Sequence, residues 1–266
     1  MTIFEALILG AIQGITEFLP ISSSGHLVLF QKIFGISEPA LLFDTMVHVG
    51  TLLAVFVVLW KDIWNILRRP MQRLTGFLIL ATIPAVIVAL VFKDAIEDAF
   101  VSATFLGFAF LITAALLMVS DLLSKRPGSI KGETEMGWID ALIIGILQGV
   151  AIIPGVSRSG STLSGALSRK LDRGFAARFS FLLSIPAILG ALVLQLKDVF
   201  SGSPAVAGIG MAPIIAGTLA AAVVGFFSVR FMLNLVREHS LWGFSVYVAV
   251  LGILVLIDQY VSHVFF

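Results

Sequence analysis

Polar side chains with the types and spacing of a reactive site interrupt an apolar stretch near the start of the chain, residues 3–34. Gln13 and Glu17 lie four positions apart, which places them on one face of a helix, where they can hold a divalent cation or a proton acceptor. His26 follows a serine-rich tip, so a hydroxyl nucleophile and a base can lie close together. The tip consists of Ser22, Ser23, Ser24 and Gly25, of which Ser22, Ser24 and Gly25 are candidates to bind a phosphate group. Polar groups inside an apolar segment are costly, so they indicate a site.

A second reactive set interrupts another apolar stretch, residues 138–167. Arg158 carries a planar, permanently charged guanidinium that matches the geometry of phosphate oxygens. The glycine-rich turn around it leads into a predicted helix, whose free N–H groups and dipole favour a phosphate. Further candidate phosphate donors in this turn are Ser157, Ser159, Gly160 and Thr162. Midway along an apolar stretch, Arg158 has no nearby interface to reach, which favours phosphate binding over a side chain that snorkels to the surface.

The two stretches are copies of one another, aligned without gaps. Gln13 falls on Gln148, and the serine and glycine pairs Ser22/Ser157, Ser24/Ser159 and Gly25/Gly160 also coincide. The copies differ where chemistry is expected, because Ser23 aligns with Arg158. We therefore interpret the chain as a single transmembrane domain, residues 1–266, built by duplication from one repeat at 1–123 and a second at 136–266.

The composition is that of a polytopic membrane protein. Of the 266 residues, 59% are hydrophobic and only 12% charged, with mean hydropathy +1.07, whereas soluble domains average about 25% charged residues. The chain has no cysteine, which excludes disulfides and thiolate metal ligands. The net charge is only +1, and we expect no nucleic-acid partner. The N-terminus lacks a basic n-region, so we expect no cleaved signal peptide.

Six segments are apolar enough to cross a bilayer, which takes roughly 20 residues. They are 41–60, 74–92, 100–122, 175–196, 207–230 and 241–261. The two reactive stretches are broken in the middle by Pro, Gly and Ser, and each half is too short to cross. At the start of the first span, Asp44 and His48 share a helix face, either at the mouth of a cavity or as an interfacial pair.

The distribution of lysine and arginine predicts the topology, because these residues collect on the cytoplasmic side. Basic loops at 122–137 and 168–174 flank the second broken stretch, and loop 61–73 is also basic. Loop 93–99 is acidic and loop 197–206 nearly neutral. We therefore predict an all-α polytopic fold with six transmembrane helices and two re-entrant helical hairpins in an inverted-topology repeat. The hairpins enter from opposite faces and meet near the midplane, as in many transporters, and both termini lie outside.

Three motifs resemble those of the bacterial undecaprenyl-pyrophosphate phosphatase family, also called bacitracin-resistance proteins. They are (E/Q)xxxE at Gln13–Glu17, FLPxSS(S/T)GH at Phe18–His26 and PGxSRSxxT at Pro154–Thr162, and the similarity covers the whole chain. The resemblance implies hydrolysis of a polyprenyl pyrophosphate lipid to the monophosphate in the bacterial inner membrane, which recycles the lipid carrier of peptidoglycan synthesis. It also implies a divalent cation, Mg²⁺ or Ca²⁺. Gln13 stands where some members of the family have glutamate, so this chain has one carboxylate fewer for the metal.

The matching motifs imply which residues of this chain correspond to the family's functional residues. They are Glu17, Ser23, His26, Ser157, Arg158, Ser159 and Thr162. Of these, Glu17, Ser23, His26 and Arg158 are expected to be catalytic, with Ser23 or His26 attacking phosphorus or activating water. We expect the site to be reached from the outer face, because the first hairpin opens outward. Two alternatives stay open at this point. The inverted repeat also suits a polyprenyl-phosphate flippase or an anion transporter, and the assembly is a monomer or a homodimer.

Overall fold

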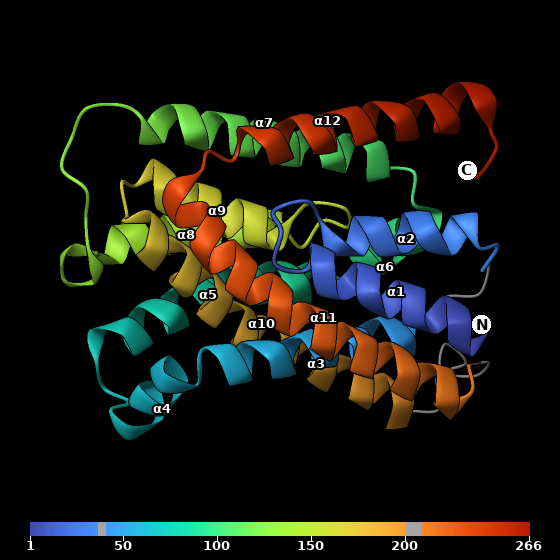
Figure 1. Ribbon diagram of the computed structural model, residues 1–266, viewed down its shortest axis with the longest axis horizontal. Coiled ribbons are helices and arrows are strands. Elements are labelled where there is room, and N and C mark those ends of the chain that lie inside the picture. The colour runs from blue at the N-terminus through green and yellow to red at the C-terminus, as the bar shows by residue number, and fades with distance from the viewer. Residues whose placement is uncertain (37–40, 201–208) are drawn as a thin grey trace.

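The computed structural model describes residues 1–36, 41–200 and 209–266 (Figure 1). Within these ranges every regular element is a helix, and the only bridge pairing joins Lys131 to Leu171. The helices are α1 (Ile3–Thr16), α2 (Ser23–Ile33), α3 (Leu41–Val58), α4 (Trp60–Arg68), α5 (Arg73–Val91), α6 (Lys93–Ser102), α7 (Leu106–Ser124), α8 (Trp138–Val150), α9 (Arg158–Ser168), α10 (Arg173–Phe200), α11 (Met211–Glu238) and α12 (Trp242–Ile257). The 3₁₀ turn η1 (Glu133–Glu135) precedes α8, and the π-helical turn η3 (Asp258–Ser262) follows α12.

Five of the described helices are long and apolar enough to cross a membrane, namely α5, α7, α10, α11 and α12. A sixth span arises if α3 and α4 are taken together, although the two helices meet at a bend of 80°. α1 and α8 are apolar but shorter. The chain is therefore an all-helical, multi-pass membrane protein.

Several predicted boundaries are wrong. The predicted loop 93–99 lies inside α6, so the third span begins at Leu106 rather than at residue 100. The fifth span begins at Met211 and continues past residue 230 to Glu238. Within this extension of α11, the guanidinium of Arg230 lies over the Phe226 ring. A long basic side chain can cover apolar surface in this way while its charge stays in a polar layer.

The first predicted span, 41–60, is also wrong at its end. α3 ends at Val58, and α4 turns away with Trp60 and Trp64 stacked on one side. Paired tryptophans suit the boundary between lipid and water. The fourth predicted span, 175–196, corresponds to α10, which runs on to Phe200, into the predicted loop 197–206. The rest of that loop lies in 201–208, outside the described residues.

Close backbone contacts fix the first helix of each hairpin. α1 packs along α11, and α8 packs along α5. A Cβ on Gly10 would lie only 2.2 Å from the Gly217 oxygen, and one on Gly145 would lie 2.7 Å from the Ala81 oxygen. Small residues allow such an approach between helices in lipid. The duplicated glycines therefore set how deep each hairpin sits against its neighbouring span.

The two hairpins, α1–α2 and α8–α9, reach the centre of the molecule from opposite ends (Figure 1). Both termini lie at one end, and α4 and the connection from α7 to α8 lie at the other. The segments flanking α8–α9 are tied together, because the Lys131 N–H donates to the Lys170 carbonyl at 2.8 Å and the Asp172 N–H donates to the Lys131 carbonyl at 2.8 Å. The chain thus enters and leaves this hairpin at the same end.

Candidate active site

Matching serine caps begin the second helix of each hairpin. The Ser22 hydroxyl accepts from the Gly25 N–H at 3.2 Å, and the Ser157 hydroxyl accepts from the Gly160 N–H at 3.0 Å. Each hydroxyl therefore satisfies a backbone donor of the first turn, the usual role of an N-cap serine. Ser22 adopts φ +72°, a conformation that costs energy for a residue other than glycine and is often found at functional sites. Both serines were predicted to bind phosphate, and their first role here is structural.

The buried carboxylate of Glu17 is the centre of the site. Its Oε2 accepts from the Ser23 hydroxyl at 2.5 Å and from the Gln13 Nε2 at 2.9 Å. Its Oε1 accepts a hydrogen bond from the Nη2 of Arg158 and forms an ion pair with that guanidinium. Glu17 is only 6% exposed, and a charge buried to this extent requires such partners. The carboxylate of the first hairpin, its serine and the arginine of the second hairpin are therefore in direct contact.

The two hairpin tips also touch through weaker polar contacts. The Gly155 N–H donates to the Ser24 hydroxyl at 3.4 Å, and the Ser159 hydroxyl donates to the Leu19 carbonyl at 3.1 Å. Gly155 has φ +89°, a left-handed conformation that suits glycine. These contacts bring the breaks of the two hairpins together in one polar region, in keeping with the prediction that the hairpins meet.

The ring nitrogens of His26 have partners other than the Ser23 hydroxyl. Its Nδ1 lies 2.7 Å from the Ser22 carbonyl oxygen, and its Nε2 lies 2.8 Å from the Tyr247 hydroxyl. A carbonyl oxygen only accepts, so Nδ1 carries the hydrogen and Nε2 is the acceptor in the neutral ring. The ring stacks on Tyr247 and meets Phe110 edge-on. His26 therefore braces the start of α2 against α12 and α7.

A different histidine approaches the central carboxylate. The Nε2 of His48 lies 3.5 Å from the Glu17 Oε2, and its Nδ1 lies 2.6 Å from the Asp44 carbonyl oxygen. The Asp44 side chain instead accepts from Gln31 at 2.7 Å. The sequence left Asp44 and His48 either at a cavity mouth or as an interfacial pair. In the structure, His48 reaches the Glu17 carboxylate, whereas the Asp44 side chain pairs with Gln31.

Arg158 keeps donor capacity beyond its contact with Glu17. Its Nη1 is buried and makes no hydrogen bond within the described part of the chain. A buried, unpaired guanidinium nitrogen is expensive, so its position favours a ligand that accepts hydrogen bonds there. Thr162, predicted to contact phosphate, instead hydrogen-bonds the Arg158 carbonyl at 2.9 Å and lies 2.6 Å from the Ser180 hydroxyl. It fixes the first turn of α9, which carries the arginine.

Sequence inspection missed the residues that support this site from other helices. The Thr113 hydroxyl accepts from the Ser157 N–H at 3.0 Å, and Ser180 and Tyr247 contact Thr162 and His26. Each lies between apolar neighbours in its span, with no spacing or motif to mark it. An isolated polar side chain within a span was the only available signal.

The side chains around Glu17 provide only some of the ligands that a hard cation needs. Within 1–36, 41–200 and 209–266, no group of three or more His, Cys, Asp or Glu side chains is gathered as a metal site. The Gln13 Oε1, however, is buried and has no hydrogen-bond partner among these residues. One carboxylate and one amide oxygen suit Mg²⁺, which usually takes its remaining ligands from water and substrate phosphates.

These features define a polytopic helical membrane protein with a buried carboxylate–arginine centre between two helical hairpins. The profile of the family described as bacitracin resistance protein BacA matches residues 6–254. The chain belongs to this family, as its motifs predicted.

Several relatives in this family match the chain over nearly its whole length. It is 47% identical over 259 residues to the undecaprenyl-diphosphatase of Carboxydothermus hydrogenoformans, covering 97% of this chain and 98% of that protein. It is 46% identical over 265 residues to undecaprenyl-diphosphatase 4 of Bacillus thuringiensis strain Al Hakam, covering 100% of both. The undecaprenyl-diphosphatase of Methanosphaera stadtmanae is 40% identical over 279 residues, covering 97% of this chain and 98% of that protein.

Proposed function

We propose that this chain is a membrane phosphatase that hydrolyses undecaprenyl pyrophosphate to the monophosphate and inorganic phosphate, which recycles the lipid carrier of cell-wall synthesis. The relatives named undecaprenyl-diphosphatase support this activity, because they align over nearly all of both chains. The single structural observation that carries it is the Glu17 carboxylate, which accepts from both the Ser23 hydroxyl and the Arg158 guanidinium. A nucleophile, a proton acceptor and a phosphate-binding cation thus meet at one buried point.

Ser23 is the nucleophile in this proposal. Its Oγ attacks the terminal phosphorus, while Glu17 accepts the hydroxyl proton along the existing hydrogen bond. The bond from that phosphorus to the bridging oxygen breaks, and undecaprenyl monophosphate leaves with the bond's electron pair. The departing monophosphate takes the proton from Glu17, which is then a carboxylate again. Glu17 next deprotonates a water molecule, whose oxygen attacks the phosphoserine phosphorus while the bond from that phosphorus to Oγ breaks. Oγ recovers the proton from Glu17, and inorganic phosphate is released.

Arg158 binds the charge that develops on the transferred group. Its unpaired Nη1 is available to a phosphate oxygen, and a guanidinium fork matches two such oxygens at once. The first turn of α9 adds backbone N–H groups and the positive end of the helix dipole. Fixed donors of this kind stabilise developing charge without reorganising during the reaction.

His26 acts as a positioning residue in this scheme. Both its ring nitrogens already face the Ser22 carbonyl and the Tyr247 hydroxyl, so its contacts hold the turn that aims Ser23 at Glu17. His48 lies nearer the reacting carboxylate and orients it.

A divalent cation, Mg²⁺ or Ca²⁺, fits the same point together with the substrate. Glu17 and the unpaired oxygen of Gln13 would hold it. When bound, such an ion neutralises the pyrophosphate and favours departure of the leaving group. Gln13 keeps an oxygen beside Glu17 without adding a second negative charge.

The matched caps and glycine contacts support an inverted repeat of two re-entrant hairpins. Ser22 and Ser157 cap equivalent helices, and Gly10 and Gly145 contact equivalent spans. We place the protein in the bacterial inner membrane, with the substrate reaching the site from the outer face, where the first hairpin opens. The lipid tail would leave sideways between helices into the bilayer.

The alternative, a flippase or anion transporter, is disfavoured because pure transport needs Arg158 but no serine hydrogen-bonded to a buried carboxylate. The deciding measurement is phosphate release from undecaprenyl pyrophosphate by purified protein in detergent, where no gradient exists. We expect multiple turnovers in the wild type and strong loss in Glu17→Gln. Absence of release by well-folded wild-type protein, with Mg²⁺ and Ca²⁺ supplied, would overturn the proposed function.

A further inference from the structure

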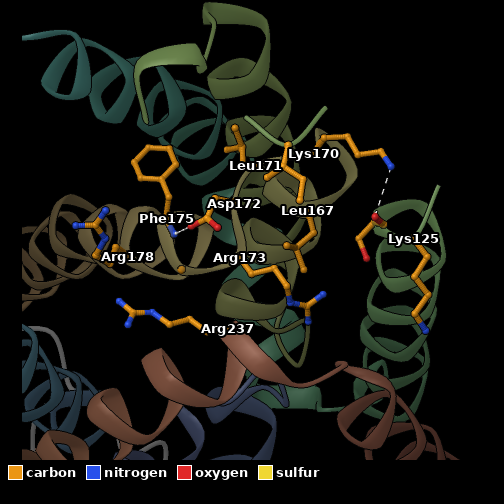
Figure 2. Close-up of a pocket in the computed structure, with 12 residues that line it drawn as sticks. Lys125, Leu167, Lys170, Leu171, Asp172, Arg173, Phe175, Arg178 and Arg237 are labelled. Atoms are coloured by element: carbon orange, nitrogen blue, oxygen red, sulfur yellow. Dashed lines mark hydrogen bonds between the residues drawn. The ribbon is translucent and has the colours of Figure 1, made fainter. Parts of the chain in front are cut away.

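A basic cavity that shares no residue with the Glu17 centre lies where the ends of α7 and α11 meet the turn between α9 and α10 (Figure 2). Its volume is about 570 Å³, within the usual range for ligand pockets. Among the described residues, five cationic side chains and one carboxylate line it. The cations are Lys125, Lys170, Arg173, Arg178 and Arg237, and the carboxylate is Asp172. We call this group the basic pocket.

Two of the five charges are compensated by carboxylates outside the pocket. Lys125 forms an ion pair with Asp121 at 2.7 Å, and Arg178 lies 3.6 Å from Asp62. The second pair is partly exposed, with 38% of the arginine side chain accessible, so solvent screens it. The pocket therefore keeps an excess of positive charge.

Lys170 and Arg173 are held in place without being neutralised. Arg173 donates to the Val236 carbonyl at 2.7 Å and to the His239 carbonyl, and Lys170 donates to the Ser124 carbonyl at 3.4 Å. A carbonyl oxygen accepts a hydrogen bond but carries no net charge, so both cations keep their full charge. Their orientation is fixed before any anion arrives, which lowers the entropy cost of binding.

Arg237 has no hydrogen bond or ion pair to any residue that the structure describes, although it borders the pocket beside Gly174. The one carboxylate of the pocket is occupied, because an Asp172 oxygen accepts from the Phe175 N–H at 2.9 Å and caps α10 (Figure 2). An exposed guanidinium next to a preformed cationic cavity is free to bind two oxygens of a phosphate group.

Apolar side chains also line the cavity. Leu167, Leu171 and Phe175 are among them and are almost fully buried. The pocket thus combines cationic and apolar side chains at the end of the helix bundle that holds α4 and the connection from α7 to α8. Basic pockets between helices at a membrane surface suit anionic phosphate groups.

We propose that the basic pocket is a second anion site, which binds a phosphate group borne either by an acidic phospholipid headgroup or by free inorganic phosphate. The basic pocket shares no residue with the Glu17 centre. The proposal of a second anion site can therefore be tested separately from the hydrolytic activity.

Binding is measured by titration calorimetry on the purified full-length protein in a nonionic detergent. The probes are short-chain phosphatidylglycerol, short-chain phosphatidylcholine and inorganic phosphate. The variants are Arg237→Gln and Arg237→Glu. Their controls are Arg69→Gln and Arg69→Glu, which make the same charge changes at an exposed arginine after α4, outside the pocket. All four variants leave Arg158 in place, so any binding at the central site contributes equally.

We expect saturable binding of phosphatidylglycerol or inorganic phosphate and no binding of phosphatidylcholine. Arg237→Gln should weaken this binding about fivefold, the effect of one basic residue near an anionic group, and Arg237→Glu should weaken it further. The Arg69 variants should bind like the wild type. Binding of phosphatidylglycerol alone identifies a lipid headgroup site, and binding of both anions identifies a site for the phosphate group itself. Equal weakening in both variant series, or no saturable binding of either anion, would overturn the proposal.

Discussion

Arg158 at the start of α9 is paired with Glu17 at the end of α1, 141 residues earlier in the chain. Neither charge has another ion-pair partner of comparable closeness within the described residues, since His48 lies 3.5 Å from the carboxylate. Breaking a buried pair by removing one partner costs about 3–5 kcal/mol. Each hairpin therefore needs the other to pair its buried charge. The same ion pair links the two tips where the reaction is proposed.

Arg158→Lys should reduce turnover about 10²-fold, the usual cost of one lost charge-stabilising donor. An ammonium group on a flexible chain cannot contact the Glu17 carboxylate and two phosphate oxygens in the geometry of a planar guanidinium. Steady-state phosphate release and thermal unfolding should be measured side by side. Arg169→Lys is the matched control, because Arg169 pairs with Asp140 at 2.7 Å at the other end of α9. Near wild-type turnover in Arg158→Lys would assign Arg158 a structural role.

Ser23→Ala should lower activity by at least about 10³-fold, because it removes the proposed nucleophile. Ser24→Ala is the neighbouring control. Its hydroxyl makes two long contacts, one from the Gly155 N–H at 3.4 Å and one with the Ser22 hydroxyl at 3.5 Å, so its loss should cost no more than about fivefold. His26→Gln should keep slow turnover. Wild-type samples should be quenched in acid and, separately, in alkali, because phosphoserine survives acid and phosphohistidine survives alkali. Mass spectrometry should detect phosphoserine at Ser23 in the acid-quenched sample, whereas phosphohistidine at His26 in the alkali-quenched sample would make the assignment wrong.

Gln13→Glu should lower the Mg²⁺ or Ca²⁺ concentration needed for half-maximal activity by about tenfold. A second carboxylate beside Glu17 strengthens a site for a hard cation. Gln148→Glu is the internal control, because Gln148 occupies the duplicated position but donates to the Ala81 carbonyl at 3.2 Å. Metal titrations of both variants and of Glu17→Gln should be compared, with direct metal binding by calorimetry. If the metal titrations of Gln13→Glu and Glu17→Gln match that of the wild type, the metal does not bind to this face of α1.

Gly10→Ala should destabilise the protein by about 2 kcal/mol, because the added methyl would overlap the Gly217 backbone and force α1 away from α11. Gly190→Ala serves as control. That glycine lies in α10 with no atom within 4 Å of an added Cβ, so alanine should be neutral or stabilise by up to about 1 kcal/mol. Thermal unfolding in detergent provides the comparison. Equal stability of the two variants would show that the close approach of α1 and α11 is not required.

Cysteines placed at Pro127 and Asp172 should react with an impermeant reagent from the same side of the membrane. Lys131 ties the segments on either side of α8–α9 together through its backbone, and both positions are exposed. Position 171, by contrast, is 2% exposed and unsuitable. A cysteine at Phe265 should react from the opposite side. The chain contains no native cysteine to interfere. Reaction of the first two from opposite sides would contradict a hairpin that enters and leaves on one face.

The sequence by itself determined the class of the protein, its family and most of the residues that gather at the centre. Hydropathy reports whether a segment lies in lipid, and the gapless duplication placed Ser23 and Arg158 at equivalent positions. These are local properties of composition and spacing, which need no knowledge of partners. Helix ends were less accurate, as in α6, α11 and the bend after α3, because amphipathic residues near an interface fit a helix or a loop equally well.

Only the tertiary structure decided which side chains touch. The motif placed His26 beside the serines, yet its ring turns toward Tyr247, and His48 approaches Glu17 instead. Spacing along one helix fixes which face a residue occupies, but it does not fix what another helix brings to that face. The physical reason is that Glu17 and Tyr247 find their partners through packing between distant spans. Such packing depends on backbone approach at residues such as Gly10, and no local pattern encodes it.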